Sequence, residues 1–364
     1  MLLKDIVAAL EELAPPALQE SYDNSGLLVG YPNQTITGVI CCLDSTEAVI
    51  DEAVSRGCNL VVAHHPIIFS GLKKITGKNY IERTVIKAIR HDVAVYAIHT
   101  NLDNVQHGVN QKFADKLGLT NRRILAPRRD DLLKLEVYVP VAHAEAIRQA
   151  VFQAGGGHIG NYDECSFAIS GEGTFRPREG ANPTVGQQGV RHTDSEFLLS
   201  FMVPKWMRQR VHKAMVDAHP YEEVAHQWFT LGNVLQDVGS GMIGELPQDM
   251  AIETFFNMLK TNMNVPTVRH TKVVKESVRR IAVCGGSGSF LLQDAIVAGA
   301  DVFVTADFKY HQFFDADGRI MIADIGHYES EQFTIELLGD WFRQKFPTFA
   351  SHLTAIDTNP VFYT

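Results

Sequence analysis

The sequence has few cysteines, no long apolar run and no excess of positive charge, and each absence argues against a class of protein. The five cysteines are odd in number and form no C-x-x-C pair, so they indicate reduced, structural thiols rather than a disulfide framework. No apolar run approaches the roughly 20 residues that a membrane-spanning helix needs. The formal net charge of −9 supplies no basic surface for nucleic acid. We therefore expect neither a membrane nor nucleic acid among its partners.

Signals for secretion and for covalent catalysis are missing as well. The first 16 residues, MLLKDIVAALEELAPP, repeat apolar residues at helical spacing with charges among them, which predicts an amphipathic helix rather than a signal peptide. We accordingly expect a cytoplasmic protein. The chain has no G-x-S-x-G elbow and no plausible Cys–His nucleophile. Water activated by a metal is therefore favoured over a covalent intermediate.

Short apolar segments alternate with amphipathic ones in two separate stretches of the 364 residues. The first runs from about residue 37 to 103, and the second covers about the last 85 residues. This alternation predicts an α/β fold of mainly parallel sheets covered by helices. The length is more than one compact core usually has, so we expect two or three domains.

The middle of the chain has a different pattern, in which strand, helix and strand segments succeed one another with alternating rather than continuous apolar residues. It predicts a small α+β domain of ferredoxin-like type with an antiparallel sheet, interrupted by a long Gly- and Pro-rich connection at 171–194. We expect residues 128–233 to form this domain, inserted into a discontinuous α/β domain made of residues 1–127 and 234–364.

Histidines and carboxylates follow four of the predicted strands at the point where each strand ends. They are His64 and His65 after LVVA, His99 and Asp103 after VAVYAI, Asp307 and His311 after DVFVTA, and His327 and Glu331 after IMIADI. In a parallel sheet, ligands bind beyond the carboxyl ends of the strands, so these side chains are expected to share one site.

The spacing of these residues indicates two metal ions rather than one. If a helix begins near Gly326, His327 and Glu331 lie four residues apart on one helical face and can reach the same cation. The neighbours His64 and His65 point to opposite sides of an extended strand and are better placed to serve two ions. A carboxylate, either Asp103 or Glu331, would then bridge the pair.

Other roles remain open for part of this set. A single strand-end histidine is usually only hydrogen-bonded, and it is the coincidence of several such ends that favours metal. For His99 we expect the orientation of a ligand or proton transfer. Asp307 and His311 could orient a ligand, contact substrate or cap a turn. In a hydrolase we expect His99, Asp307 and His311 to be the catalytic residues, with His99 or His311 moving protons. Imidazole and carboxylate ligands suit Zn, Fe, Mn or Mg without selecting among them.

A glycine-rich turn follows the strand segment IAVC and contains Gly285, Gly286, Ser287 and Gly288. Such a turn can present backbone N–H groups to a phosphate. It matches neither G-x-G-x-x-G nor the Walker pattern, because Leu291 stands where the last glycine would be and no Lys-Ser/Thr follows. Phosphate binding at these four residues is therefore a prediction that rests on the turn alone.

Six short motifs, DNSGLLVG, AHHP, HTNLDN, CGGSGS, TADFKYH and IGHYESE, together resemble the family of GTP cyclohydrolase 1 type 2 homologs, the NGG1p-interacting-factor-3-like proteins. The resemblance implies a dinuclear site with two divalent metal ions. It places the family's ligands on His64, His65, Asp103, His327 and Glu331. It also implies a PII- or CutA-like inserted domain and a toroidal hexamer whose metal sites face an interior cavity.

Two functions follow from these patterns. The first is a metal-dependent hydrolase that acts on a nucleotide-like or phosphorylated small molecule through metal-activated water. The alternative is a metal-handling or regulatory adaptor without turnover, in which the inserted domain senses a small ligand.

Overall fold

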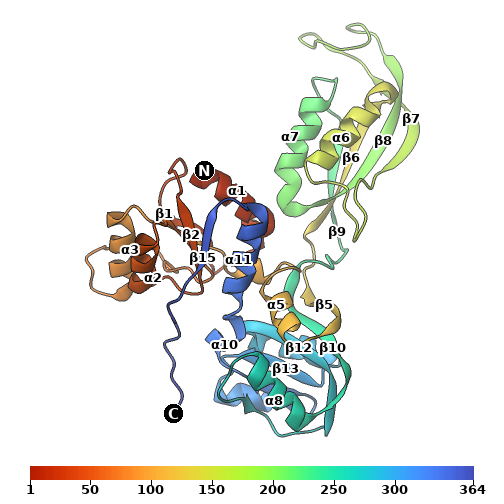
Figure 1. Ribbon diagram of the computed structural model, residues 1–364. Helices are drawn as coiled ribbons and strands as arrows, with labels where there is room; N and C mark the ends of the chain where they lie inside the picture. Colours follow the sequence, from red (N-terminus) through yellow and green to blue (C-terminus); the bar gives the residue numbers. More distant parts are fainter. The chain divides into compact units, whose positions relative to one another are not determined.

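The computed structural model describes residues 1–364, which divide into two compact units. Unit 1 consists of Met1–Ala126 and Asp237–Thr364, and unit 2 of Pro127–Gln236, inserted between the two parts of unit 1 (Figure 1). The chain leaves unit 1 at the end of β5 (Thr120–Pro127) and re-enters it just before β10 (Gly239–Ala251). None of the helices combines the length and apolar character that a membrane crossing requires.

The first sheet of unit 1 has the order β1-β4-β3-β2-β15. Its strands are β1 (Gly26–Val29), β4 (Ala94–Ala97), β3 (Leu60–Ala63), β2 (Gly38–Cys42) and β15 (Ala350–Leu353). All neighbours pair in parallel except β1 with β4. The three central strands are wholly buried, because helices pack on both faces. One face is covered by α2 (Glu47–Ser55) and α3 (Tyr80–Arg90), the other by α1 (Leu3–Leu13) and α11 (Thr334–Lys345).

The second sheet of unit 1 has the order β11-β14-β13-β12-β10-β5. Besides β10 and β5 it contains β11 (Arg269–His270), β14 (Met321–Asp324), β13 (Val302–Ala306) and β12 (Ser277–Ser287). β12, β13 and β14 are parallel, whereas β11 and β10 pair antiparallel at either side of them. One face packs on α5 (Val109–Lys116) and α8 (Ile252–Asn262), the other on α9 (Leu292–Val297). The first stretch of alternation thus forms the centre of the first sheet, and the second stretch forms β12, β13 and β14 of the second sheet and also contributes α11 and β15 to the first.

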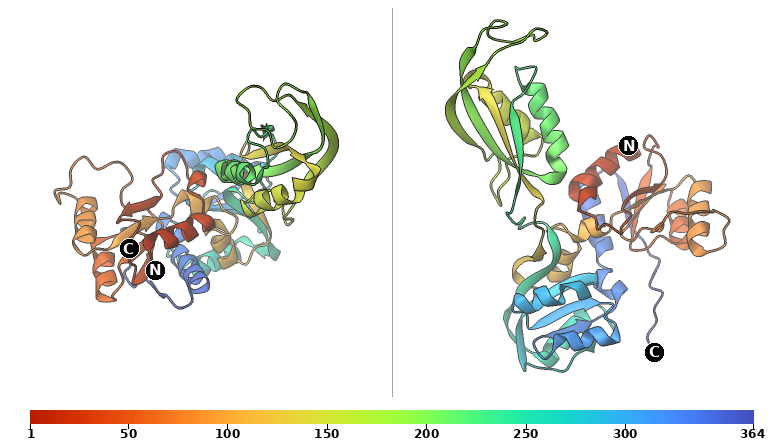
Figure 2. Two further views of the ribbon diagram at one scale, coloured as in Figure 1. Left: turned by 90° about the horizontal axis from the view of Figure 1, so that it is seen from above. Right: turned by 180° about the vertical axis from the view of Figure 1, so that it is seen from behind.

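Unit 2 has one antiparallel sheet, in the order β7-β8-β6-β9. Its strands are β6 (Leu132–Pro140), β7 (Phe167–Phe175), β8 (His192–Pro204) and β9 (His226–Leu231). With α6 (Ala144–Gln153) and α7 (Arg208–Ala218) they follow the β-α-β-β-α-β order of ferredoxin-like domains. Both helices lie against one face of the curved sheet (Figure 2). The expected connection at 171–194 is shorter than predicted, because β7 and β8 extend into it from both sides.

Asp301 fastens the start of β13 to β12 and offers a test of this packing. Its Oδ2 accepts hydrogen bonds from the backbone N–H groups of Arg279 and Arg280, both at 2.9 Å, and its Oδ1 pairs with Lys275. Burial alone would raise the pKa of Asp301, but the bond to Lys275 and the two amides outweigh it and hold the pKa below its usual value.

We expect Asp301→Asn to lower the free energy of unfolding at pH 7 by about 1–2 kcal/mol, because the side chain loses its negative charge and one of its two acceptor oxygens. The carboxyl of Asp301 has a lower pKa in the folded protein than in the unfolded chain. Its contribution to stability is therefore full above the unfolded pKa of about 4 and is lost as the pH falls through the folded pKa. Urea unfolding at pH 7 and at pH 3 measures the loss of stability and its dependence on pH. Asp249→Asn, at an exposed carboxylate, is the control. A difference that does not shrink in acid would show that the charge of Asp301 is not the cause.

Candidate metal centre

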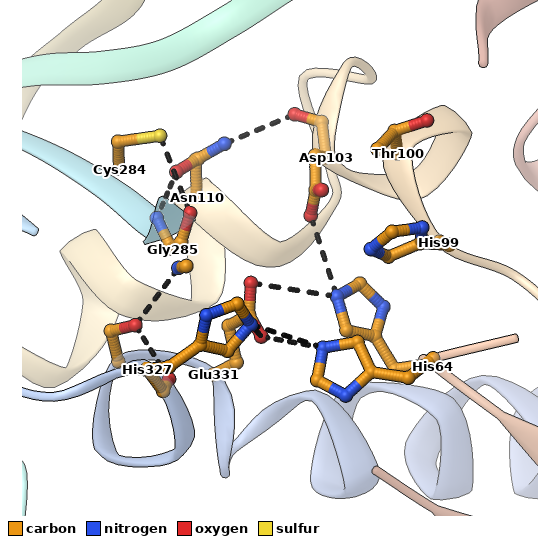
Figure 3. Close-up of polar contacts among 12 residues, drawn as sticks. His64, His99, Thr100, Asp103, Asn110, Cys284, Gly285, His327 and Glu331 are labelled. Atoms are coloured by element: carbon orange, nitrogen blue, oxygen red, sulfur yellow. Dashed lines mark hydrogen bonds and ion pairs between the residues drawn. The ribbon is translucent and has the colours of Figure 1, made fainter. Parts of the chain in front are cut away.

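Six histidine and carboxylate side chains from both sheets of unit 1 converge at the carboxyl ends of their strands (Figure 3). His64 and His65 follow β3 directly. His99 precedes the short helix α4 (Thr100–Asp103), of which Asp103 is the last residue. These four residues lie close to His327 and Glu331, the first and last residues of another short helix, α10 (His327–Glu331). The predicted helix that places residues 327 and 331 on one face is confirmed, and residues that follow strands of both sheets contribute to the cluster.

Glu331 occupies the centre of the cluster, between His327 and His64 (Figure 3). Its Oε2 lies 2.9 Å from Nε2 of His65 and 3.1 Å from Nε2 of His327. Its Oε1 faces the other way and lies 3.7 Å from Nε2 of His64. The side chain is only 3% exposed. One carboxylate therefore presents one oxygen to His65 and His327 and the other to His64.

The possible ligand atoms form sets of three in which all atoms lie within 4.8 Å of one another. The sets are His65 with His327 and Glu331, His64 with Asp103 and Glu331, and His64 with His65 and His99. The first two share Glu331 and no other residue. A metal ion held by one such set of three would keep coordination positions for water or substrate.

Two atoms of this cluster are buried without any hydrogen-bond partner. They are Nε2 of His64 and Oδ1 of Asp103, which lie 3.7 Å apart. That separation is too long for a hydrogen bond. A buried polar atom without a partner costs about 1–3 kcal/mol, and a cation between these two atoms would satisfy both. The residues present therefore fit a metal ion on the Asp103 side of Glu331.

A second layer of oxygen atoms orients the four imidazole rings through their Nδ1 atoms. The pairs are His64 with the carbonyl of Ile98 at 2.9 Å, His65 with Asp44 at 2.7 Å, His327 with Asp307 at 2.6 Å and His99 with Asp23 at 2.7 Å. In a neutral ring, Nδ1–H donates to each of these oxygens and Nε2 is left as an acceptor. All four rings are thus prepared to use Nε2 as the ligand atom.

Two residues of this outer layer were missed as ligand-orienting groups in the sequence. Asp44 follows β2, the neighbour of β3, and the rule that singles out strand ends could have found it. Asp23 lies in a turn before β1, and its fully buried carboxylate also accepts hydrogen bonds from the backbone of Thr100 and the hydroxyl of Ser25. The motif DNSGLLVG begins with Asp23, but it does not reveal the contact with His99, which lies 76 residues further along the chain.

The charges of the cluster depend strongly on burial and on each other. Burial, reinforced by the charge of Glu331, raises the pKa of Asp103 well above its usual value. Burial acts in the same direction on Glu331, but the charge of His327 and the imidazole hydrogen bonds outweigh it and lower that pKa well below its usual value. Burial would lower the pKa values of His65 and His327, yet their carboxylate partners raise them to about 9 and about 11. Protons on His65 and His327 thus balance the negative charge of Glu331, as bound metal ions otherwise would.

The glycine-rich turn at the end of β12 lies directly beside Glu331. The N–H of Gly285 donates to Oδ1 of Asn110 at 3.0 Å, and the N–H of Gly286 donates to Oγ of Ser330 at 2.9 Å. A Cβ on Gly286, whose φ is +61°, would overlap the Glu331 carboxylate. These glycines therefore make room for the central carboxylate. The predicted phosphate contact at Gly285, Gly286, Ser287 and Gly288 stays a prediction, with two of the amides already engaged.

Of the remaining predicted residues, Asp307 reaches the cluster and His311 does not. Oδ2 of Asp307 is hydrogen-bonded to Nδ1 of His327, and this bond lowers the pKa of the Asp307 carboxyl. His311 is exposed and has ring contacts with Tyr310 and Phe314.

A cavity of about 490 Å³ opens on the side of the cluster formed by His65, Asp307 and His327. Its wall includes the C-terminal residues 359–361 and 363. Asn359 is fastened there, since its Nδ2 donates to the buried carboxylate of Glu329 at 3.0 Å. A molecule in this cavity would lie beside the proposed ligands.

The whole chain is similar to one family of known proteins. The model of the Duf34/NIF3 (NGG1p interacting factor 3) family matches residues 1–360. A GTP cyclohydrolase 1 type 2 homolog of Halalkalibacterium halodurans is 42% identical over 325 residues, 88% of this chain and 87% of that protein. A protein of the same name from Staphylococcus aureus strain COL is 33% identical over the whole of both chains.

Solved structures give the same relationship. A Bacillus cereus protein related to NIF3 superposes with a TM-score of 0.87 at 36% identity, over 100% of this chain and 99% of that chain. Staphylococcus aureus protein SA1388 superposes with a TM-score of 0.80 at 30% identity, again over 100% and 99% of the two chains.

Proposed function

The chain belongs to the Duf34/NIF3 family, and on that premise we propose that it is a dinuclear metal-dependent hydrolase. One observation carries the proposal: the two oxygens of Glu331 face two separate sets of ligand atoms. We propose one divalent ion, Zn, Fe, Mn or Mg, at each set. The ligands of the first ion would be His64, Asp103 and Glu331, and those of the second His65, His327 and Glu331.

Such a pair of ions supplies a water molecule of lowered pKa and polarises the group that the water attacks. The protein's own contribution is to hold and orient. His99 turns Nε2 toward His64 and His65, with its Nδ1 held by Asp23, so it is placed to accept a proton from that water. Asp307 keeps His327 oriented, and Asp44 does the same for His65.

The substrate would enter the 490 Å³ cavity beside His65 and His327. Its lining combines the aromatic rings of Tyr328 and Tyr363 with the carboxylates of Asp44, Asp307 and Glu329, which favours a flat group rich in N–H donors. A nucleobase has that character, so we propose a nucleotide-like substrate. GTP is the first compound to test, because relatives of this chain carry the name GTP cyclohydrolase 1 type 2 homolog.

We expect protein reconstituted with Zn, Fe, Mn or Mg to open the ring of GTP, and a chelator or His65→Ala to abolish turnover. The change in ultraviolet absorption of the purine measures the reaction. His91→Ala, at an exposed histidine on the surface of unit 1, should keep full activity. Failure with GTP but success with another nucleotide would replace the substrate. Protein that takes up no ions at all would refute the metal centre itself.

The alternative function is a metal-handling or regulatory adaptor without turnover. A separate cavity of about 530 Å³ in unit 2 favours it, because the inserted unit could then respond to a ligand of its own. Ion release that changes when unit 2 is occupied, without turnover of any nucleotide, would support the adaptor.

The remaining properties that the resemblance implies are also proposals. The β-α-β-β-α-β order of unit 2 supports a PII- or CutA-like insert. A toroidal homohexamer rests on the resemblance alone, and a cytoplasmic location rests on the predicted N-terminal amphipathic helix. Light scattering on the purified chain measures the first, with a mass of six times 40.4 kDa expected.

A further inference from the structure

The cavity of about 530 Å³ in unit 2 lies on the face of the sheet that the helices leave uncovered. Val137 and Leu199 belong to the core beneath α6 and α7. Because side chains alternate along a strand, Tyr138 and Glu196 point to the opposite face, and both line the cavity. The volume lies within the range of about 300–1,000 Å³ that is usual for small-molecule sites.

A loop from the end of β7 closes this cavity on its outer side. The N–H of Asn182 donates to Oε1 of Glu222 at 2.9 Å, and Oγ1 of Thr184 donates to the carbonyl of Pro220 at 2.7 Å. The loop also bonds to itself, from the N–H of Gly189 to the carbonyl of Pro177 at 2.9 Å. The outer wall is therefore fastened to the turn that follows α7.

Glu196 is the most unusual group in the lining. The residue is only 8% exposed and its carboxylate forms no ion pair. The neighbouring hydroxyl of Tyr221 donates to Oδ2 of Asp194 at 3.4 Å. Burial, with the neighbouring charge of Asp194, raises its pKa. A Cβ on Gly173 would overlap the Glu196 carboxylate, so the glycine leaves space for it. A buried carboxylate without a cation is costly unless a ligand supplies donors.

The rest of the lining supplies two flat surfaces and two cations. The rings of Phe175 and Tyr221 have centroids 5.9 Å apart and are inclined by 58°. Arg176 and Arg178 are exposed, line the same cavity and form no ion pair. Their guanidinium groups are free to bind a carboxylate or a phosphate through two parallel hydrogen bonds.

We propose that this cavity binds a small anionic molecule that carries a planar pair of N–H donors. The donors would bond to Glu196, the planar group would lie beside Phe175 and Tyr221, and the anion would bind Arg176 and Arg178. Two kinds of compound share this chemistry. A guanine nucleotide has the amide and amino N–H groups of its base and a phosphate, and a guanidino acid has its guanidinium and a carboxylate. The proposal does not depend on the proposed hydrolase.

Calorimetric titration of the full chain, kept free of metal by a chelator, tests the proposal with GMP and L-arginine as probes. We expect saturable binding of one of them, with one molecule per chain. IMP, which lacks the 2-amino group, and L-citrulline, which lacks the charge, are the ligand controls and should bind at least tenfold more weakly. The probe that binds identifies the kind of compound.

Two variants test the contacts at the two ends of the ligand separately. Glu196→Gln should weaken binding at least tenfold, because an amide cannot accept both N–H groups. Arg176→Ala with Arg178→Ala should weaken the probe that binds at least tenfold. If that probe is GMP, binding of guanosine, which has no phosphate, should not change. Arg191→Ala removes an exposed arginine of unit 2 that does not line the cavity and should change nothing.

Three results would overturn the proposal. One is the absence of saturable binding by both probes up to millimolar concentration in protein that unfolds cooperatively. Another is binding that neither Glu196→Gln nor the double arginine variant changes. The third is binding that His65→Ala abolishes, since the ligand would then lie at the metal centre. Thermal unfolding of each variant serves as the check on folding, and Glu196→Gln should not lower the unfolding temperature.

Discussion

Glu331→Gln is expected to lower the affinity for both of the proposed metal ions by at least about 100-fold, a loss beyond the 10–100-fold usual for residues that only support a ligand. The reason is that each oxygen of Glu331 faces a different ligand set, and an amide offers one oxygen and an uncharged nitrogen. Elemental analysis after dialysis against a buffered concentration of free metal measures the ions retained. Wild type should retain two ions per chain and the variant fewer than one.

A matched control for this substitution exists on α11. Glu336 is 37% exposed and pairs with Lys112 and Lys116 at the surface of unit 1, away from the ligand sets. Glu336→Gln should therefore retain the wild-type metal content. If Glu331→Gln also retained two ions with unchanged affinity, the bridging role of this carboxylate would be refuted.

Gly286→Ala should weaken metal binding at least tenfold although it changes no ligand. The added Cβ would overlap Oε1 of Glu331 and lie 3.3 Å from Cε1 of His327, so the carboxylate must move. The positive φ of +61° adds a backbone cost of roughly 1–2 kcal/mol to the free energy of unfolding. Metal competition with a fluorescent chelator and urea unfolding measure the two effects separately.

Gly318 provides the comparison that isolates the steric effect. Its φ is +66°, close to that of Gly286, but a Cβ there would meet no atom within 4 Å. Gly318→Ala should show the same loss of stability with full metal affinity. Equal metal affinities in the two alanine variants would show that the position of Glu331 does not limit binding.

The sequence predicted the parallel centres of both sheets because their strands are short, continuous apolar runs that end in polar residues. β3 and β4 show this most clearly, since every residue of both is buried. The same rule singled out the side chains that the structure brings together around Glu331. Strand ends at one edge of a parallel sheet are neighbours whatever their distance along the chain.

Pairings between distant parts of the chain were not visible in the sequence. β15 joins β2 as an additional parallel strand of the first sheet, and only two residues of β11 pair with β14. His311 illustrates another limit. Asp307 adopts a positive φ of 60°, and Phe308 and Phe313 then pack beneath the second sheet, so the segment after Asp307 leaves His311 on the surface. Local pattern places a residue near a strand end but does not determine which way the following turn runs.

The distribution of ligands along the chain has a consequence for how the protein is made. His65 and His327 lie 262 residues apart, and β15 completes the first sheet only after both have been synthesised. Unit 2, a compact unit encoded between them, can fold while the ribosome is still working. The proposed metal centre cannot be complete until Glu331 has been synthesised. Metal uptake would then report that synthesis has passed this residue, and a chain that stops before it would lack a member of two ligand sets.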